Sequence, residues 1–350
     1  MPPANERMQL TWLTGCPSRP VSVHRRACER SGFGSPATQL MRAVSLLPPS
    51  GVYSRMESPN FDQRAIRKVF EARCPGLHVE SVVTLSEQGQ FNRLFLINDA
   101  LVFRCPRYQD GILTLKREAQ ILAQIRDKVP LRTPRVRWVS STGAELGEAF
   151  LTYDVLPGKP LWPEVLEFEV DAGVRVEIAR QLGGFLAALH GIVLWDEARQ
   201  WPELDGADVW SQMYEEIRER LFAAMRPDAR RAVEAHFAEY LRNPSLQEFT
   251  PCLRHGDFGS GNVLYDVGER SISGILDFSE AGIGDAAVDL AAVSCFGDDM
   301  YAEICAAYPG VEAHLARARF YRGTFALQEA LHGLRVGDRE AYDSGMESYR

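Results

Sequence analysis

The hydrophobic positions of the chain follow a helical period in some segments and a strand period in others. FDQRAIRKVFEARCPG is apolar at 61, 65, 66, 69 and 70, which predicts a helix closed by Pro75–Gly76. HVESVVTLSEQGQFNRLFLINDALVFRCPR predicts three strands, with turns at Gly89 and Asn98–Asp99. A helix, ILTLKREAQILAQIRDKV, and two strands, RVRWVS and EAFLTYDVL, follow. Together these segments indicate a small β-rich α+β lobe over residues 58–156.

The pattern changes at Pro157–Gly158–Lys159–Pro160, beyond which helical periods dominate. The predicted helices are VEIARQLGGFLAALHGI, DVWSQMYEEIRERLFAAM, DARRAVEAHFAEYLR, AAVDLAAVSCF and a long one near 311–333. A short strand pair, NVLYD and SISGILDF, interrupts them. The chain is therefore predicted to form a second, larger and mainly helical lobe over 157–350. Ligand sites usually lie in the cleft between two such lobes.

Residues 1–57 lack a sustained period and are rich in Pro, Ser and Arg. We interpret them as a disordered extension, or as a coding region begun upstream of a true start at Met56; a transit peptide is the alternative. Up to Met56 the chain carries seven Arg and two Glu, a charge of +5, so the net charge of −8 leaves −13 for the remainder. An acidic body is a poor nucleic-acid binder but suits a cationic ligand.

Composition narrows the class of protein. Apolar residues make up 45% of the chain and charged residues 25%, as in ordinary soluble domains, and no apolar stretch is long enough for a membrane span. The seven cysteines are scattered without a C-x-x-C pair, which argues against a zinc ribbon or a disulfide scaffold and favours a reducing cytoplasm. The oligomeric state is left open.

The candidate chemistry lies in LRHGDFGSGNVLYD, residues 253–266, and in ILDFSEAGIGDAAVDL farther on. Glycines shape the first segment into a loop between strands, and it carries Asp257 and Asn262. Asp277 ends the next strand-like run, so the three side chains are expected to emerge near one another. Protein kinases use H-R-D-x-x-x-x-N followed by D-F-G, and the spacing from Asp257 to Asn262 matches that order. Two carboxylates and an amide are hard oxygen ligands that suit Mg²⁺ held partly through substrate phosphates.

The chain resembles the aminoglycoside phosphotransferase family over about residues 60–345. The stretches that carry the resemblance are HGDFGSGNVLYD, ILDFSEAGIGDAAVDLA, LSEQGQFNRLFLINDALVFRCPR and FLTYDVLPGKPL. The nearest subgroups are the aminoglycoside 2″-phosphotransferases and the macrolide phosphotransferases. The resemblance implies a two-lobed protein-kinase-like fold and Mg²⁺-dependent transfer of the γ-phosphoryl group of ATP or GTP to a hydroxyl of a small molecule. An aminoglycoside-type or macrolide antibiotic is the expected acceptor.

The resemblance also implies roles for residues of the helical lobe. Asp257 would orient or deprotonate the acceptor hydroxyl, and Asn262 and Asp277 would hold Mg²⁺. Structural support is expected from three further residues, His255, Asp285 and Asp289. For Asp289 the alternative is a helix carboxylate that interacts only with the helix dipole.

On the nucleotide side, Arg104 stands where kinases usually carry a lysine, and Glu118 is its expected helix partner. Arginine keeps the charge but differs in geometry from lysine. The remaining nucleotide-binding candidates are Gly89 and Asn92 in the loop over the phosphates and Tyr153 and Val155 along the base. Candidates for acceptor binding are the acidic residues Glu280, Asp298, Asp299 and Glu329, each of which has a solvated surface charge as its alternative.

Two other functions fit the same residues. One is a metabolic kinase of the same fold that phosphorylates an amino alcohol or a sugar amine. The other is a nucleotide-binding pseudokinase; the presence of Asp257, Asn262 and Asp277 argues against it, whereas Arg104 argues slightly for it. Fold likeness alone does not fix a substrate.

Overall fold

The structure is a computed structural model that describes residues 63–74, 76–86, 92–109, 111–140 and 148–350. The described residues form two compact units. The first contains the residues up to Lys116 together with Val136–Val155, and the second contains Arg117–Arg135 and Leu156–Arg350. The boundary passes through helix α2 (Gly111–Ile125). The predicted N-terminal extension and Gly89 lie outside the described residues.

The first unit is built on one antiparallel sheet with the strand order β1-β2-β3-β5-β4. Its elements are α1 (Gln63–Arg73), β1 (Val82–Ser86), β2 (Asn92–Ile97), β3 (Leu101–Pro106), the first part of α2, β4 (Val136–Ser140) and β5 (Phe150–Asp154). Asn98 and Asp99 join β2 to β3 with φ angles of 51° and 53°, the left-handed values that a two-residue hairpin turn needs. The five strands and the turn agree with the sequence-based prediction.

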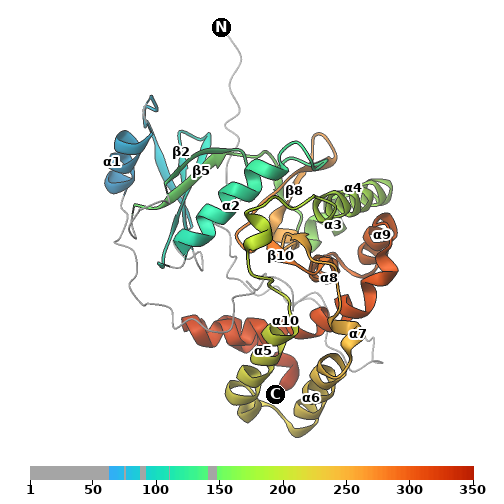
Figure 1. The fold of residues 1–350 in the computed structure, drawn as a ribbon. Coiled ribbons are helices and arrows are strands. Elements are labelled where there is room, and N and C mark those ends of the chain that lie inside the picture. Colours follow the sequence, from blue (N-terminus) through green and yellow to red (C-terminus); the bar gives the residue numbers. More distant parts are fainter. Residues whose placement is uncertain (1–62, 75, 87–91, 110, 141–147) are drawn as a thin grey trace, which may run out of the picture. The chain divides into compact units, whose positions relative to one another are not determined.

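An aromatic cluster forms the core of the first unit, where α1 packs on the sheet (Figure 1). The ring of Phe103 on β3 lies 5.1 Å from that of Phe70 on α1 and 5.1 Å from that of Phe150 on β5. All three side chains are buried. Each fully buried phenylalanine contributes about 1.5–3 kcal/mol through removal of its apolar surface from water.

The second unit is mainly helical. Its helices are the second part of α2, α3 (Pro163–Glu169), α4 (Ala172–His190), α5 (Ala207–Arg220), α6 (Pro227–Leu241), α7 (Pro244–Gln247), α8 (Ala286–Ala292), α9 (Asp298–Ala307), α10 (Leu315–Val336) and α11 (Arg339–Met346). Its strands are β6 (Lys159–Pro160), β7 (Cys252–Arg254), β8 (Val263–Asp266), β9 (Ser271–Ile275) and β10 (Gly282–Gly284). Short 3-10 turns include Ala198–Gln200, Ser260–Asn262 and Val311–Ala313.

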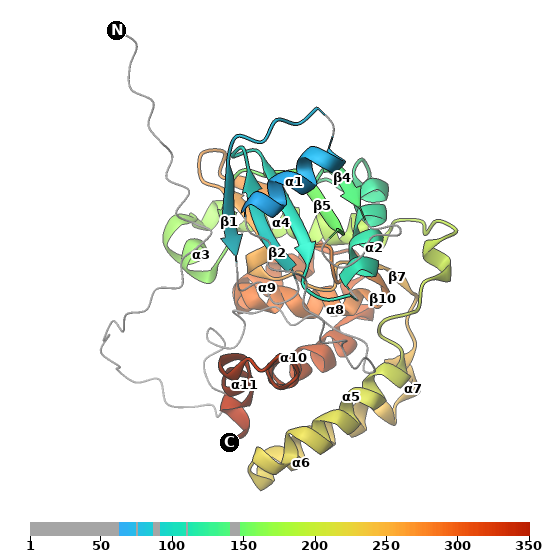
Figure 2. The same cartoon turned by 90° about the vertical axis from the view of Figure 1, so that its left-hand side faces the viewer.

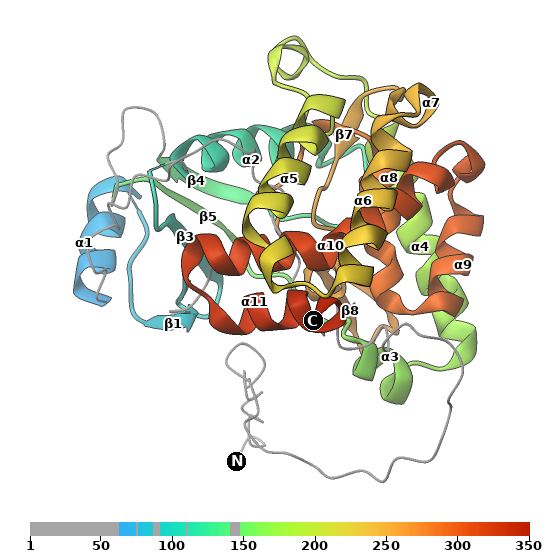
Figure 3. The same ribbon diagram turned by 90° about the horizontal axis from the view of Figure 1, so that it is seen from below.

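Helix α10 is the centre of the helical packing in the second unit. It contacts α8, α11, α5 and α6, and Figures 2 and 3 show α5 and α6 as a pair and α11 beside α10. The prediction of one long helix from about 311 was wrong at its start, because Gly310 is left-handed and a 3-10 turn precedes α10. The short strands β6 and β10 were not predicted.

Two strand pairs bring the motif loops together. β7 pairs with β10, and β8 pairs with β9, all antiparallel. The loop 255–262 joins β7 to β8, and the loop 276–281 joins β9 to β10. Each loop therefore runs between the same two strand pairs. Phe258 in the first loop stacks on Phe185 of α4 with ring centroids 5.7 Å apart, and both rings are fully buried. The loops are therefore fixed to the helical core.

Candidate active site

The loop after β7 is shaped by a glycine that no other residue can replace without strain. Gly256 has a φ of +85°, which only glycine adopts without cost. A Cβ atom at this position would also collide with the guanidinium of Arg254 and the carbonyl of Glu280. The sharp turn lets Asp257 follow His255 in a different direction from the strand.

Gly256→Ala is expected to lower the free energy of unfolding by about 2–4 kcal/mol, because the positive φ and the collision act together. Urea unfolding measures this change. The matched control is Gly184→Ala in α4, where a Cβ would have no heavy atom within 4 Å. There alanine should stabilise the helix slightly, by up to about 1 kcal/mol. Equal effects at both positions would contradict the described loop geometry.

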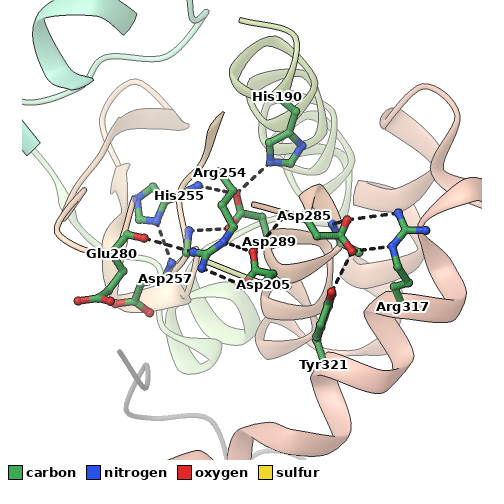
Figure 4. Close-up of polar contacts among 12 residues, drawn as sticks. His190, Asp205, Arg254, His255, Asp257, Glu280, Asp285, Asp289, Arg317 and Tyr321 are labelled. Carbon is green, nitrogen blue, oxygen red and sulfur yellow. Dashed lines mark hydrogen bonds and ion pairs between the residues drawn. The ribbon is translucent and has the colours of Figure 1, made fainter. Parts of the chain in front are cut away.

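The side chain of Asp289, on α8, binds the backbone of this loop (Figure 4). Its two carboxylate oxygens accept hydrogen bonds from the backbone nitrogens of His255 and Gly256, each at 2.7 Å. The ring Nε2 of His190, at the end of α4, lies 3.0 Å from the same carboxylate, and His190 Nδ1 lies 3.0 Å from the hydroxyl of Tyr308. Burial alone would raise the pKa of Asp289, but the hydrogen bond and charge of His190 lower it, so the carboxylate is ionised.

His255 braces the second loop against the first. Its Nε2 lies 2.9 Å from the carbonyl oxygen of Leu276, and its Nδ1 accepts a hydrogen bond of 3.2 Å from the backbone nitrogen of Asp257. These contacts require a neutral ring with the proton on Nε2. Burial lowers the pKa of His255 and favours that neutral form. His255 is thus a structural link between the two loops.

Asp257 and Asn262 form a direct pair within the loop. The amide nitrogen of Asn262 donates to the carbonyl oxygen of Asp257 and to its Oδ2, each at 2.9 Å. The backbone carbonyl of Asn262 accepts a 2.7 Å hydrogen bond from Leu276, directly before Asp277. The side-chain nitrogen of Asn262 points at Asp257, so a cation at this site would be bound by the side-chain oxygen of Asn262.

Asp277 adopts a conformation that is rare outside glycine. Its φ is 57°, and its Oδ1 accepts hydrogen bonds from the hydroxyl and the backbone nitrogen of Ser279, at 2.7 and 3.3 Å. Left-handed non-glycine residues cost about 1–3 kcal/mol and cluster at functional sites. The turn fixes the direction of the Asp277 carboxylate.

The environment of Asp257 disfavours its charged form. Burial, followed by repulsion from Asp277 and Glu280, raises the pKa of Asp257 to about 8, while the Asn262 hydrogen bond lowers it. Such a concentration of negative charge favours a bound cation. The oxygen donors of Asn262 and Asp277 fit Mg²⁺, which is commonly bound through one or two protein oxygens plus substrate phosphates. Over residues 63–350, excluding the gaps in the description, no cluster of three or more His, Cys, Asp or Glu side chains could hold a metal by itself.

In magnesium-free buffer, Asp257→Asn is expected to stabilise the protein more at pH 8 than at pH 5. The wild-type carboxyl has a raised pKa in the folded state, so its contribution to stability is full below its unfolded value of 3.8 and is lost as the pH rises to about 8. Because Asp257 is partly exposed, solvent limits the gain to about 1–2 kcal/mol, or about 2–8 °C in Tm. Thermal unfolding across this range, with and without Mg²⁺, measures it. A difference independent of pH would contradict the assigned environment.

Comparison with known proteins shows the family of the chain. A family model described as the phosphotransferase enzyme family matches residues 82–321. Viomycin phosphotransferase from Streptomyces vinaceus is 32% identical over 205 residues, covering 57% of this chain and 69% of the relative. The chain belongs to the phosphotransferase enzyme family. The predicted enzyme class, a phosphotransferase with an alcohol group as acceptor, is confirmed.

Solved structures of family members share the fold. The complex of an APH(2″) aminoglycoside phosphotransferase with GDP and kanamycin has a TM-score of 0.72 and 22% identity, covering 80% of this chain and 95% of that one. The macrolide 2′-phosphotransferase MphH from Brachybacterium faecium has a TM-score of 0.62 and 19% identity, covering 82% and 98%. The predicted kinase-like α+β fold of this phosphotransferase is thus confirmed. In the described part of the chain, no helix combines the length and apolarity that a membrane crossing needs.

Residues predicted to bind the nucleotide lie partly in the first unit. Arg104 is in the middle of β3, opposite Leu94 and Leu151, and its side chain is buried. With the amide oxygen of Asn92 turned toward it, the Arg104 guanidinium donates two hydrogen bonds to Asn92, at 2.8 and 3.0 Å. Glu118 is a buried residue of α2 in the part that groups with the second unit, so its pairing with Arg104 stays a prediction.

Tyr153 and Val155 lie at the end of β5. Tyr153 is half-buried and faces Val102 and Val136 in the ladder. The backbone nitrogen of Val155 donates to Ala100 at 2.9 Å. A nucleobase could therefore use the carbonyl of Val155 but not its nitrogen, which narrows the predicted role of this residue.

The four acidic candidates for acceptor binding differ in environment. Glu280 is half-buried in the second loop, where its charge raises the pKa of Asp257. Asp298 and Asp299 are exposed in the first turn of α9, and Asp298 lies 3.5 Å from Arg322, as a solvated surface charge would. Glu329 is buried on α10. Of the four, only Glu280 is among the residues that raise the pKa of Asp257.

Asp285 supports the site through a second set of contacts, also drawn in Figure 4. It caps α8 by accepting from Ala287 at 3.0 Å. It also accepts from Arg317 at 2.5 and 3.2 Å and from the hydroxyl of Tyr321 at 3.0 Å, both on α10. These partners were not predicted from the sequence, and neither were the roles of His190, Asp205 and Arg254. No motif marks them, because their contacts join residues far apart in the chain.

Proposed function

We propose that this phosphotransferase transfers the γ-phosphoryl group of ATP or GTP, with Mg²⁺, to a hydroxyl of an antibiotic that carries several amino groups. The observation that carries the proposal is the Asp257–Asn262–Asp277 arrangement on two adjoining loops. The viomycin phosphotransferase relative and the kanamycin-bound structural neighbour support the class of acceptor. Kanamycin-type aminoglycosides and viomycin are the two leading acceptors.

In this mechanism Asp257 accepts or orients the proton of the acceptor hydroxyl so that the oxygen attacks in line. Asn262 holds the Asp257 carboxylate in place through its amide nitrogen, and its side-chain oxygen would hold the cation together with Asp277. When bound, Mg²⁺ supplies positive charge that offsets the charge on the transferring phosphates. The reaction then depends mainly on positioning and charge neutralisation.

Glu280 is proposed to attract the amino groups of the acceptor toward Asp257. A polyamine acceptor should bind more weakly as salt is added, because screening reduces attraction to partly exposed carboxylates. A macrolide acceptor, suggested by the macrolide phosphotransferase neighbour, would show a weaker salt dependence.

The test is a nucleoside-diphosphate release assay with Mg²⁺, run with ATP and with GTP. The panel contains viomycin, kanamycin, gentamicin, streptomycin, a macrolide and amino-alcohol metabolites. Stimulation by at least one antibiotic is the expected result. Stimulation by a metabolite alone would make the protein a metabolic kinase, and nucleotide binding without any turnover would favour a pseudokinase.

A further inference from the structure

A buried ion pair, Arg254–Asp205, adjoins the two active-site loops. Arg254 is the last residue of β7 and precedes His255. Its Nε and Nη2 donate to the two carboxylate oxygens of Asp205, at 2.6 and 3.0 Å, and both side chains are fully buried (Figure 4). The planar guanidinium and the carboxylate thus form a bidentate pair, the geometry that best fixes direction.

The pair also holds the backbone of the second loop. The Nη1 of Arg254 donates to the carbonyl oxygen of Glu280 at 3.2 Å. The Oδ2 of Asp205 accepts from the backbone nitrogen of Asp285 at 2.9 Å. Glu280 follows Asp277 by three residues, and Asp285 begins the helix that carries Asp289. The ion pair therefore fixes both ends of the segment 280–285.

Asp205 connects this segment to helix α5. Its backbone carbonyl accepts from the ring nitrogen of Trp210 at 3.2 Å, and Leu204 donates to the carbonyl of Ile283 on β10 at 2.9 Å. Gly284 on β10 leaves room for the carboxylate, since a Cβ there would collide with Asp205. The backbone around Gly284 and Asp285 therefore packs tightly against the Asp205 carboxylate.

Stability alone does not explain such a pair. Desolvation of two charges offsets most of their attraction, and well-packed apolar residues can replace buried ion pairs without loss of stability. An apolar pair could not hold the Glu280 carbonyl or the Asp285 nitrogen. The distinctive contribution of Arg254 and Asp205 is therefore geometric.

We propose that Asp205 and Arg254 are positioning residues that set the turn 277–280 relative to Asp257. Through this turn they determine how tightly Asp277 and Asn262 hold the divalent cation with the nucleotide. The inference rests on the proposed function for the identity of the site. Outer contacts of this kind typically change metal affinity by about 10–100-fold.

The test is the double variant Asp205→Leu/Arg254→Met, which replaces the pair by apolar residues of similar size. Urea unfolding reports its stability, and electron paramagnetic resonance reports Mn²⁺ binding in the presence of ADP. We expect a folded but less stable protein, because the Glu280 carbonyl and the Asp285 nitrogen lose their partners. Mn²⁺ affinity should be about 10-fold weaker and kcat about 10-fold lower, with the acceptor KM within about 2-fold. Unchanged Mn²⁺ affinity and kcat in the folded double variant would overturn the proposal.

Arg254→Lys is the second variant, and it decides the question if the double variant does not fold. Lysine keeps the charge but cannot make the bidentate pair together with the third hydrogen bond, so Mn²⁺ affinity should fall by roughly 3–10-fold. Wild-type Mn²⁺ affinity in a folded Arg254→Lys protein would overturn the proposal.

The matched control is Glu216→Leu/Arg335→Met, which removes a two-point ion pair between α5 and α10. Mn²⁺ affinity and kcat should stay at the wild-type values there. An equal loss in this control would overturn the proposal, because the effect would then not be specific to the loops. If the wild-type protein binds Mn²⁺ and ADP but phosphorylates no acceptor, the proposed function fails while the Mn²⁺ titration still decides the inference.

Discussion

Asp257→Asn is expected to lower kcat by about 10²–10⁴-fold while nucleotide binding stays close to the wild-type level. Asparagine keeps the shape of the side chain and its contact with Asn262, which donates to Asp257 Oδ2 at 2.9 Å. It cannot accept the proton of the acceptor hydroxyl. Steady-state kinetics with a saturating acceptor and Mg²⁺ measure the loss, and nucleotide titration checks that the site is formed.

The matched control is Asp266→Asn, the same substitution nine residues along the chain. Asp266 ends β8 and accepts from the backbone of Gly268 at 2.8 Å and of Glu269 at 3.1 Å, which the oxygen of asparagine can also do. Its kcat should stay within about twofold of wild type, in line with a surface substitution that keeps its contacts. Retention of more than a tenth of wild-type kcat in Asp257→Asn would remove Asp257 from its assigned role.

Asp289→Ala is expected to lower the free energy of unfolding by about 3–5 kcal/mol and to abolish most activity. The substitution leaves the buried backbone nitrogens of His255 and Gly256, both bonded at 2.7 Å, without their acceptor. It also removes the partner of His190. Urea unfolding measures the stability, and the transfer assay measures the activity.

An exposed carboxylate provides the comparison for Asp289. Asp343 pairs with Arg339 and Arg350 on the surface, so Asp343→Ala should leave the free energy of unfolding close to the wild-type value. If Asp289→Ala cost no more than this control, the loop would not depend on α8, and the described support of the site would be wrong.

Local signals made much of the fold predictable. The strands of the first unit are short runs rich in Val, Leu and Phe. Two of them, β2 and β3, meet at the turn Asn98–Asp99, whose residue types tolerate left-handed backbone. The motif loop was predictable for the same reason, because Gly256, Asp257 and Asn262 act within a few residues of one another. Features that depend on residues close together in the chain can be predicted from a single sequence.

Structural support from His255, Asp285 and Asp289 was expected from the family resemblance, but the partners of these residues were not predictable, because the contacts join distant positions. Asp205 and Arg254 are separated by 49 positions, and His190 and Asp289 by 99. Glycine-rich β10 has no hydrophobic pattern by which to recognise it as a strand. Nothing in the local sequence distinguishes a buried charge with a partner from a solvated one.

The most direct test of the central claim is mass spectrometry of the acceptor after incubation with wild-type protein, Mg²⁺ and a nucleoside triphosphate. The account predicts that an antibiotic which stimulates diphosphate release gains one phosphate group on a hydroxyl, and that Asp257→Asn forms almost none of this product. Diphosphate release with an unmodified acceptor would contradict the account, because the site would then transfer the γ-phosphoryl group to water.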